Sequence, residues 1–155
     1  MRNRTHVAVA CAVALGVLAL ATSVVADDSD DTLRSYLAKS DLVVLGEITS
    51  EPSEFRKEIG IANYVCDFKV ADVLKGKLLA EKTLTVKIAR FERDEDDRIP
   101  ELKNGGKCIL FLKRAANGET PSWKTADFWF GLQRPSPWMA RSLKRLAAQE
   151  GSKTK

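Results

Sequence analysis

The sequence predicts a mainly β domain, a small five-stranded Greek-key barrel with a short N-terminal helix and a C-terminal helix. Two segments alternate apolar and polar residues, as strands with one buried face do. Two others are apolar on both faces, as strands covered on both sides are. In the first of these, residues 42–49, Gly46 would allow a sharp bend or a bulge, which suits a strand shared by the two halves of a closed barrel.

The N-terminus predicts export. Residues 7–26 carry no charge, follow Arg2 and Arg4, and end in small residues before a run of aspartates. This pattern is typical of a secretory signal peptide cleaved after Ala26, and it predicts a secreted or periplasmic protein. The alternative is an uncleaved membrane anchor, because the apolar run approaches the ~20 residues that a spanning helix needs.

Removal of residues 1–26 leaves 129 of the 155 residues, enough for one domain. We expect an acidic leader and short helix over residues 27–40, the barrel over 41–135, and the C-terminal helix with a basic tail over 136–155. The mature chain has 23 basic and 21 acidic residues, a net charge of +2. So small an excess does not indicate a nucleic-acid partner.

The N-terminal helix is predicted over residues 31–39. Leu33, Tyr36 and Leu37 have helical spacing there, and one of the aspartates at 30 and 31 is the expected N-cap.

Five strands are predicted between the two helices. The segment 63–74 places Tyr64, Cys66 and Phe68 on one face, and the segment 83–88 alternates in the same way. The segment 107–113 follows an Asn-Gly-Gly turn signal and is apolar through its middle, so both of its faces should be covered. The last strand, rich in aromatic residues, is the weakest pattern. The five predicted strands are 42–49, 63–74, 83–88, 107–113 and 123–130.

The C-terminal helix has a clear start signal, since Ser136 can cap it and Pro137 suits its first position. One side carries an apolar stripe, Met139, Leu143 and Leu146, and the other carries three cations, Arg141, Lys144 and Arg145. Such a helix packs its stripe on the core, although a basic amphipathic helix can also lie on an anionic membrane.

Several of these segments together resemble a known group. The stretches SDLVVLGEITS, FKVADVLKGKL, LTVKI and LKNGGKCILFLK, within roughly residues 40–113, resemble secreted bacterial domains of the netrin-like, or tissue-inhibitor-of-metalloproteinase-like, OB-fold group. The resemblance implies an OB-like barrel and a binding or inhibitor-like function. The zinc-chelating N-terminal cysteine of the metalloproteinase inhibitors has no counterpart, because the expected mature chain starts at Asp27 and its first cysteine is Cys66.

The residues argue against an enzyme. The sole histidine, His6, leaves with the signal peptide, which excludes catalytic Ser-His-Asp and Cys-His arrangements from the mature chain. A calcium site needs several oxygen ligands in a set order, which neither the leader aspartates at 27, 28, 30 and 31 nor the charged segment after residue 91 provides. A paired-carboxylate site would have to come from that charged segment, which we interpret as a solvated loop. Its acidic residues are Glu92, Asp94, Glu95, Asp96, Asp97 and Glu101. We therefore expect no catalytic residue, no metal and no cofactor.

Two cysteines remain in the mature chain, Cys66 and Cys108. An even number of cysteines in an exported chain favours a disulfide between them. The alternative is a pair of buried thiols, since free cysteine packs as a small hydrophobe.

Three tryptophans lie close together in the sequence, at Trp123, Trp129 and Trp138, near Phe128 and Phe130. They could form an exposed platform for a ligand. They could instead seal the core between the barrel and the last helix, which is the commoner use of large aromatic residues.

The sequence thus predicts a secreted, non-enzymatic binding or inhibitor-like module whose partner is a protein or envelope component and not a nucleic acid. The alternative is a structural or envelope-interaction protein, in contact with a membrane only if the N-terminal segment is retained as a tether.

Overall fold

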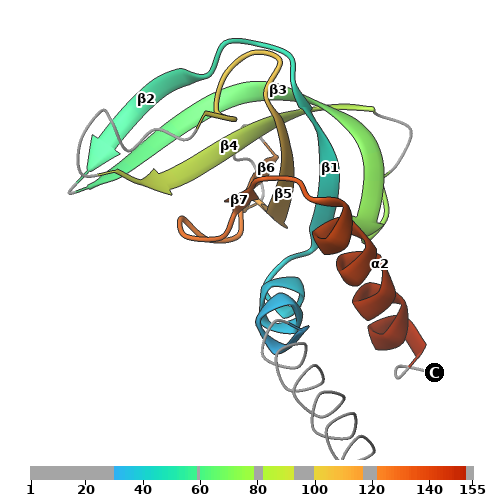
Figure 1. Ribbon diagram of the computed structural model, residues 1–155. Coiled ribbons are helices and arrows are strands. Elements are labelled where there is room, and N and C mark those ends of the chain that lie inside the picture. Colours follow the sequence, from blue (N-terminus) through green and yellow to red (C-terminus); the bar gives the residue numbers. More distant parts are fainter. Residues whose placement is uncertain (1–29, 59, 79–81, 93–99, 117–121, 153–155) are drawn as a thin grey trace, which may run out of the picture.

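The structure is a computed structural model, and it describes residues 30–58, 60–78, 82–92, 100–116 and 122–152 (Figure 1). A helix over residues 30–38 precedes the strands. The remaining elements are β1 (Leu42–Ile48), β2 (Ser53–Glu58), β3 (Ile61–Lys75), β4 (Thr83–Phe91), β5 (Lys107–Arg114), β6 (Trp123–Thr125), β7 (Leu132–Gln133) and α2 (Pro137–Ser152). The expected signal peptide lies outside the described residues.

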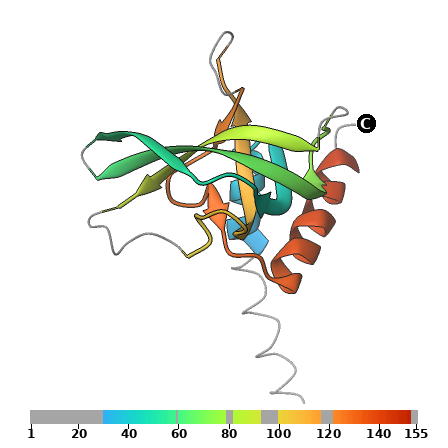
Figure 2. The same ribbon diagram turned by 90° about the horizontal axis from the view of Figure 1, so that it is seen from above.

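The strand pairings return to their starting point. β1 pairs with β3, β3 with β4, β4 with β6, β6 with β5, and β5 with β1 again. All of these pairs are antiparallel except β4–β6, and β2 and β7 pair with β3 and β5 respectively. Figures 1 and 2 show the strongly curved strands, with α2 against one side of the sheet. The predicted mainly β fold with two flanking helices is confirmed, and the circuit of pairings is what a small five-stranded barrel requires.

The first strand departs from regular pairing where the sequence predicts it. The register of β1 against β3 shifts between Leu45 and Gly46, and again between Val43 and Val44. A methyl group on Gly46 would meet the carbonyl oxygen of Lys69 and lie 2.8 Å from the ring of Phe68. Only glycine therefore allows the two strands to approach this closely.

The core consists of two clusters separated by β1 and β5. The interior cluster lies inside the circuit of strands and includes residues such as Val44, Phe68 and Val86. The outer cluster lies outside the circuit, where the N-terminal helix and α2 cover it. Its buried residues are Leu33, Leu37, Val43, Leu74, Ile109, Phe111, Phe130, Leu143 and Leu146. Because β5 alternates between the two clusters, the prediction of a strand covered on both faces is confirmed.

Four predicted strands occur as β1, β3, β4 and β5, and β3 and β4 are longer than predicted. β2 falls between the first two predicted strands, where the sequence predicts no strand. All six residues of β2, Ser-Glu-Phe-Arg-Lys-Glu, are exposed, and their sequence does not alternate apolar and polar residues. Only the pairing with β3 identifies this segment as a strand.

The predicted fifth strand, 123–130, is wrong beyond its first three residues. Only Trp123–Thr125 pairs as β6, after which the chain turns. The side chain of Asp127 accepts a hydrogen bond from the Trp129 backbone N–H at 2.7 Å. The backbone carbonyl oxygen of Asp127 accepts a second hydrogen bond from the Gly131 N–H at 3.0 Å. An aspartate that bonds the backbone two residues ahead favours a turn over a strand.

Both helices pack on the outer cluster. Ser136 caps α2 by accepting a hydrogen bond from the Met139 N–H at 3.1 Å, as predicted, and Pro137 is its first residue. The N-terminal helix differs in one detail from the prediction, because Asp30 and Asp31 both lie within the helix and neither caps it. The carboxylate of Asp30 instead pairs with the guanidinium group of Arg145 in α2 at 2.6 Å. Among the described residues, no helix is both long and apolar enough to cross a membrane.

Candidate functional site: a groove beside the C-terminal helix

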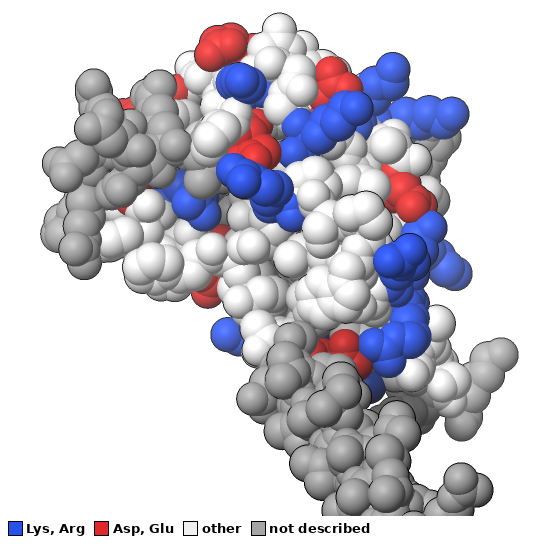
Figure 3. All heavy atoms as spheres, viewed as in Figure 1, with Lys and Arg blue, Asp and Glu red and all other residues white. Residues whose placement is uncertain are grey.

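A groove of about 540 Å³ lies on the outer surface of the sheet, beside the start of α2. Its uncharged lining consists of Leu45, Gly46, Val70, Ala71, Pro135, Ser136, Pro137 and Ala140. This volume falls within the roughly 300–1,000 Å³ of typical ligand pockets, which are also mostly apolar. Figure 3 shows an uncharged surface beside α2, with basic side chains following the helix.

The local sequence explains the shape of the groove. The bulge in β1 occurs at Leu45 and Gly46, which form part of one wall. The opposite wall is the approach to α2, where two prolines flank the capping Ser136. Leu45 and Ala140 also pack against the outer core cluster, so the groove continues the buried apolar region outward.

Three charged residues form one end of the lining. Glu47 of β1 is the direct partner of Lys69 in β3 and of Lys107 in β5. The three residues therefore form a row across three adjacent strands, with Glu47 in the middle. Among the described residues, no ion pair joins Glu47 to either lysine. The row has a net positive charge, and the first turn of α2 contains no acidic residue to offset the positive end of its dipole. The electrostatics at this end therefore favour an anionic group.

The predicted disulfide is absent, because Cys66 and Cys108 are both free thiols in the interior cluster. β1 separates their strands, and two strand spacings are roughly 9–10 Å, more than the ~7 Å between Cα atoms that a disulfide can span. The two cysteines are also offset along the strands. Cys108 of β5 is the partner of Gly46 in β1, and the partner of Gly46 in β3 is Val70, which lies four residues from Cys66. Burial raises the pKa of each thiol to about 12. Asp67 adds a smaller effect at Cys66, and Cys66 and then Glu101 add smaller effects at Cys108.

Part of the charged segment is not solvated as predicted. Glu92 is only 1% exposed, and the hydroxyl of Tyr64 donates to its two carboxylate oxygens at 3.0 and 2.9 Å. Glu101 forms an ion pair with Arg134 at 2.5 Å. The four acidic residues from 94 to 97 lie outside the described residues. Within the described part of the chain, no group of three acidic, histidine or cysteine side chains is arranged to hold a metal ion.

The three tryptophans occupy separate elements, and no ring contact joins any two of them in the described structure. Trp123 is half-buried against the interior cluster, with the guanidinium carbon of Arg114 5.4 Å from its ring centroid. Trp129 is 61% exposed, and its ring centroid lies 4.8 Å from that of Phe91. Trp138, in the first turn of α2, is 48% exposed.

The sealing role belongs to Phe130, which is 4% exposed. Its ring stacks on Tyr36 with centroids 4.3 Å apart and meets Phe111 edge to face at 5.7 Å. The aromatic segment thus divides into a buried phenylalanine and two largely exposed tryptophans. Whether those tryptophans contact a ligand stays a prediction.

Comparison with protein families and with curated proteins gives no assignment: no family model matches this chain, and no curated protein matches it. The resemblance to netrin-like domains therefore stays a prediction.

Proposed function

We propose that this protein is a non-enzymatic binding module that holds an apolar ligand in the groove beside α2. The observation that carries this proposal is the groove itself, a space of about 540 Å³ whose lining is uncharged except at one end. The expected export and the expected lack of catalytic residues agree with binding as the main activity. An inhibitor-like role would use the same surface toward a protein partner.

The proposal is tested by filling the groove. Ala140 lines it from α2, whereas Ala148 is exposed on the same helix and does not. We expect Ala140→Trp to abolish binding of the neutral apolar dye Nile red, measured by fluorescence, and Ala148→Trp to leave it unchanged. Ala71→Trp, on the β3 wall, provides a second obstruction if Ala140→Trp fails to fold. Equal dye binding by all of these folded variants would count against the groove.

A second candidate is a structural or envelope-interaction protein tethered by an uncleaved N-terminal segment. The observation in its favour is the docking of the N-terminal helix, in which Leu33 and Leu37 are buried in the outer cluster. A retained apolar segment would thus join the folded domain within a few residues, and the domain would be held close to the membrane. Intact-mass measurement of the protein from the envelope decides this, because loss of residues 1–26 excludes the tether.

A further inference from the structure

We propose that the ligand of the groove is a long-chain carboxylate, with its alkyl chain along the apolar lining and its carboxylate at the lysine end. This inference rests on the proposed function and adds the chemical class of the ligand.

The lining favours an aliphatic chain over a sugar or an aromatic ligand. Its apolar side chains are aliphatic or proline, and none carries an aromatic ring on which a sugar could stack. The one hydroxyl in the lining, that of Ser136, already accepts the hydrogen bond that caps α2. Few directional groups therefore remain to orient a polar ligand, whereas an alkyl chain needs only the removal of apolar surface from water.

The fold also disfavours an extended peptide that adds to the sheet. Such a peptide needs a strand with an unpaired edge. At the groove, β1 is paired on one side with β3 and on the other with β5. The groove therefore presents the outward face of paired strands, which suits a small ligand that makes no backbone ladder.

The charges at one end select an anionic head group. Lys69 and Lys107 are both exposed and stand on either side of Glu47, so cations outnumber the anion two to one. The positive end of the α2 dipole adds to the same field without an acidic residue in its first turn. A carboxylate placed at this end complements the lysines, whereas an alcohol of equal chain length does not.

The test compares decanoate with decanol as competitors of Nile red, using the purified protein as it is produced. We expect decanoate to bind about two- to tenfold more tightly, as expected for one or two solvent-exposed charge pairs, and added salt to reduce this advantage. Each methylene added to the carboxylate should strengthen binding up to about fourfold. Lys69→Gln with Lys107→Gln should remove the advantage of decanoate, while the matched control Lys113→Gln, outside the groove, should keep it.

The outcomes separate this inference from the proposed function. Equal affinities of decanoate and decanol, both lost in Ala140→Trp, would overturn the anionic head group and leave the binding groove standing. Affinity that does not rise with chain length would overturn the alkyl chain. If Ala140→Trp and Ala148→Trp bind Nile red and the alkyl ligands with equal affinity, the inference and the proposed function fail together.

Discussion

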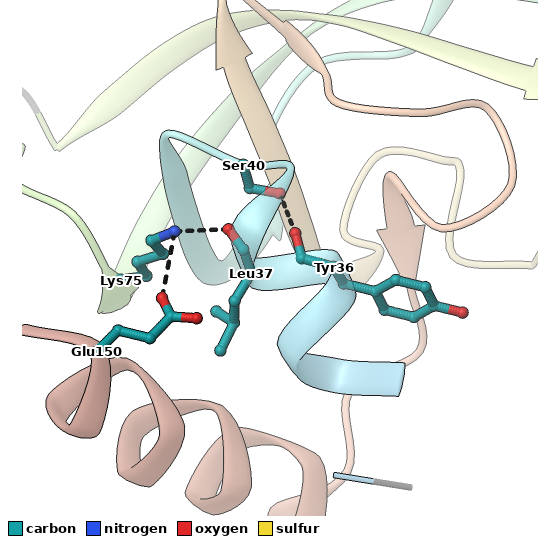
Figure 4. Close-up of polar contacts among 5 residues, drawn as sticks. All are labelled: Tyr36, Leu37, Ser40, Lys75 and Glu150. Atoms are coloured by element: carbon teal, nitrogen blue, oxygen red, sulfur yellow. Dashed lines mark hydrogen bonds and ion pairs between the residues drawn. The ribbon is translucent and has the colours of Figure 1, made fainter. Parts of the chain in front are cut away.

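The ammonium group of Lys75 lies 2.5 Å from the carbonyl oxygen of Leu37, which joins the end of β3 to the last turn of the N-terminal helix (Figure 4). The carboxylate of Glu150, from α2, lies 3.6 Å from the same ammonium group. In the same turn, the Ser40 hydroxyl donates to the Tyr36 carbonyl at 2.8 Å. The last carbonyls of a helix have no partner within it, and a cation there also complements the helix dipole.

Replacement of Lys75 by methionine should therefore destabilise the domain. Lys75→Met keeps most of the alkyl stem but removes the donor to Leu37, a bond to a charged group, and we expect a loss of about 1–2 kcal/mol. Urea denaturation followed by circular dichroism measures it. Lys77→Met, at an exposed lysine two residues away, is the control. Equal midpoints for the two variants would contradict the role assigned to Lys75.

Gly46 should tolerate no side chain. A methyl group at this position would meet the Lys69 carbonyl oxygen, which belongs to the backbone and cannot rotate away. Overpacking of this kind costs about 1–3 kcal/mol or more. In contrast, nothing lies within 4 Å of a methyl group added to Gly151, so Gly151→Ala should be neutral or slightly stabilising. Similar thermal midpoints for Gly46→Ala and wild type would show that β1 can move away from β3.

The buried pair of Tyr64 and Glu92 should be coupled. Tyr64→Phe removes the hydroxyl that donates to the Glu92 carboxylate and leaves a buried acceptor without that donor, at a cost of about 1–3 kcal/mol. A double-mutant cycle with Glu92→Gln, measured by urea denaturation, isolates the interaction. Strictly additive effects of the two substitutions would contradict a direct interaction between these side chains.

The two interior thiols should be unreactive in the folded protein. A pKa of about 12 leaves roughly one thiol in 10⁴ ionised at pH 8, and only the thiolate reacts. Iodoacetamide should therefore modify neither cysteine in the native protein and both cysteines in denatured protein that has not been reduced. Mass spectrometry counts the additions, and a denatured protein with no addition before reduction would reveal a disulfide.

The same shift predicts how stability depends on alkaline pH. Burial raises the pKa of each thiol, so above pH ~9 the unfolded chain releases protons that the folded chain keeps, and stability falls as pH rises toward 12. The slope is at most about 1.4 kcal/mol per pH unit for each thiol. The double variant Cys66→Ala, Cys108→Ala should lack this part of the slope between pH 9 and 11. An unchanged slope would mean that the thiols titrate alike in both states.

The aromatic segment should divide by burial. Phe130→Ala removes a ring packed between Tyr36 and Phe111 and should cost about 3–5 kcal/mol, whereas Trp129→Ala removes a largely exposed ring and should cost much less. Chemical denaturation of the two variants makes the comparison. A larger loss for Trp129→Ala would mean that this ring, with Phe91, supports the fold.

Much of the fold was predictable because its signals are local. The alternation of Tyr64, Cys66 and Phe68 marks one buried face of β3, and the Ser-Pro pair marks the start of α2. The break in β1 was predictable from Gly46. In contrast, the turn at Asp127 competes with an aromatic strand pattern, and the alternation alone could not show which would prevail.

The candidate site was not predictable in the same way. Its walls combine residues of β1, β3, β5 and the start of α2 that lie far apart in the sequence, and Glu47, Lys69 and Lys107 become neighbours only through strand register. Glu92 was misread for a similar reason: in a charged run the expectation is exposure, and only the position of Tyr64 on the next strand makes its burial possible.

By itself, the sequence determined which segments pair as long strands, where the last helix begins and which faces are apolar, because these depend on residues close together along the chain. The tertiary structure alone decided that two cysteines remain apart, that Phe130 and not a tryptophan closes the outer core, and that a groove opens beside α2. These features depend on which strands become neighbours and on their register, since a shift of one residue exchanges the buried and exposed faces of a strand.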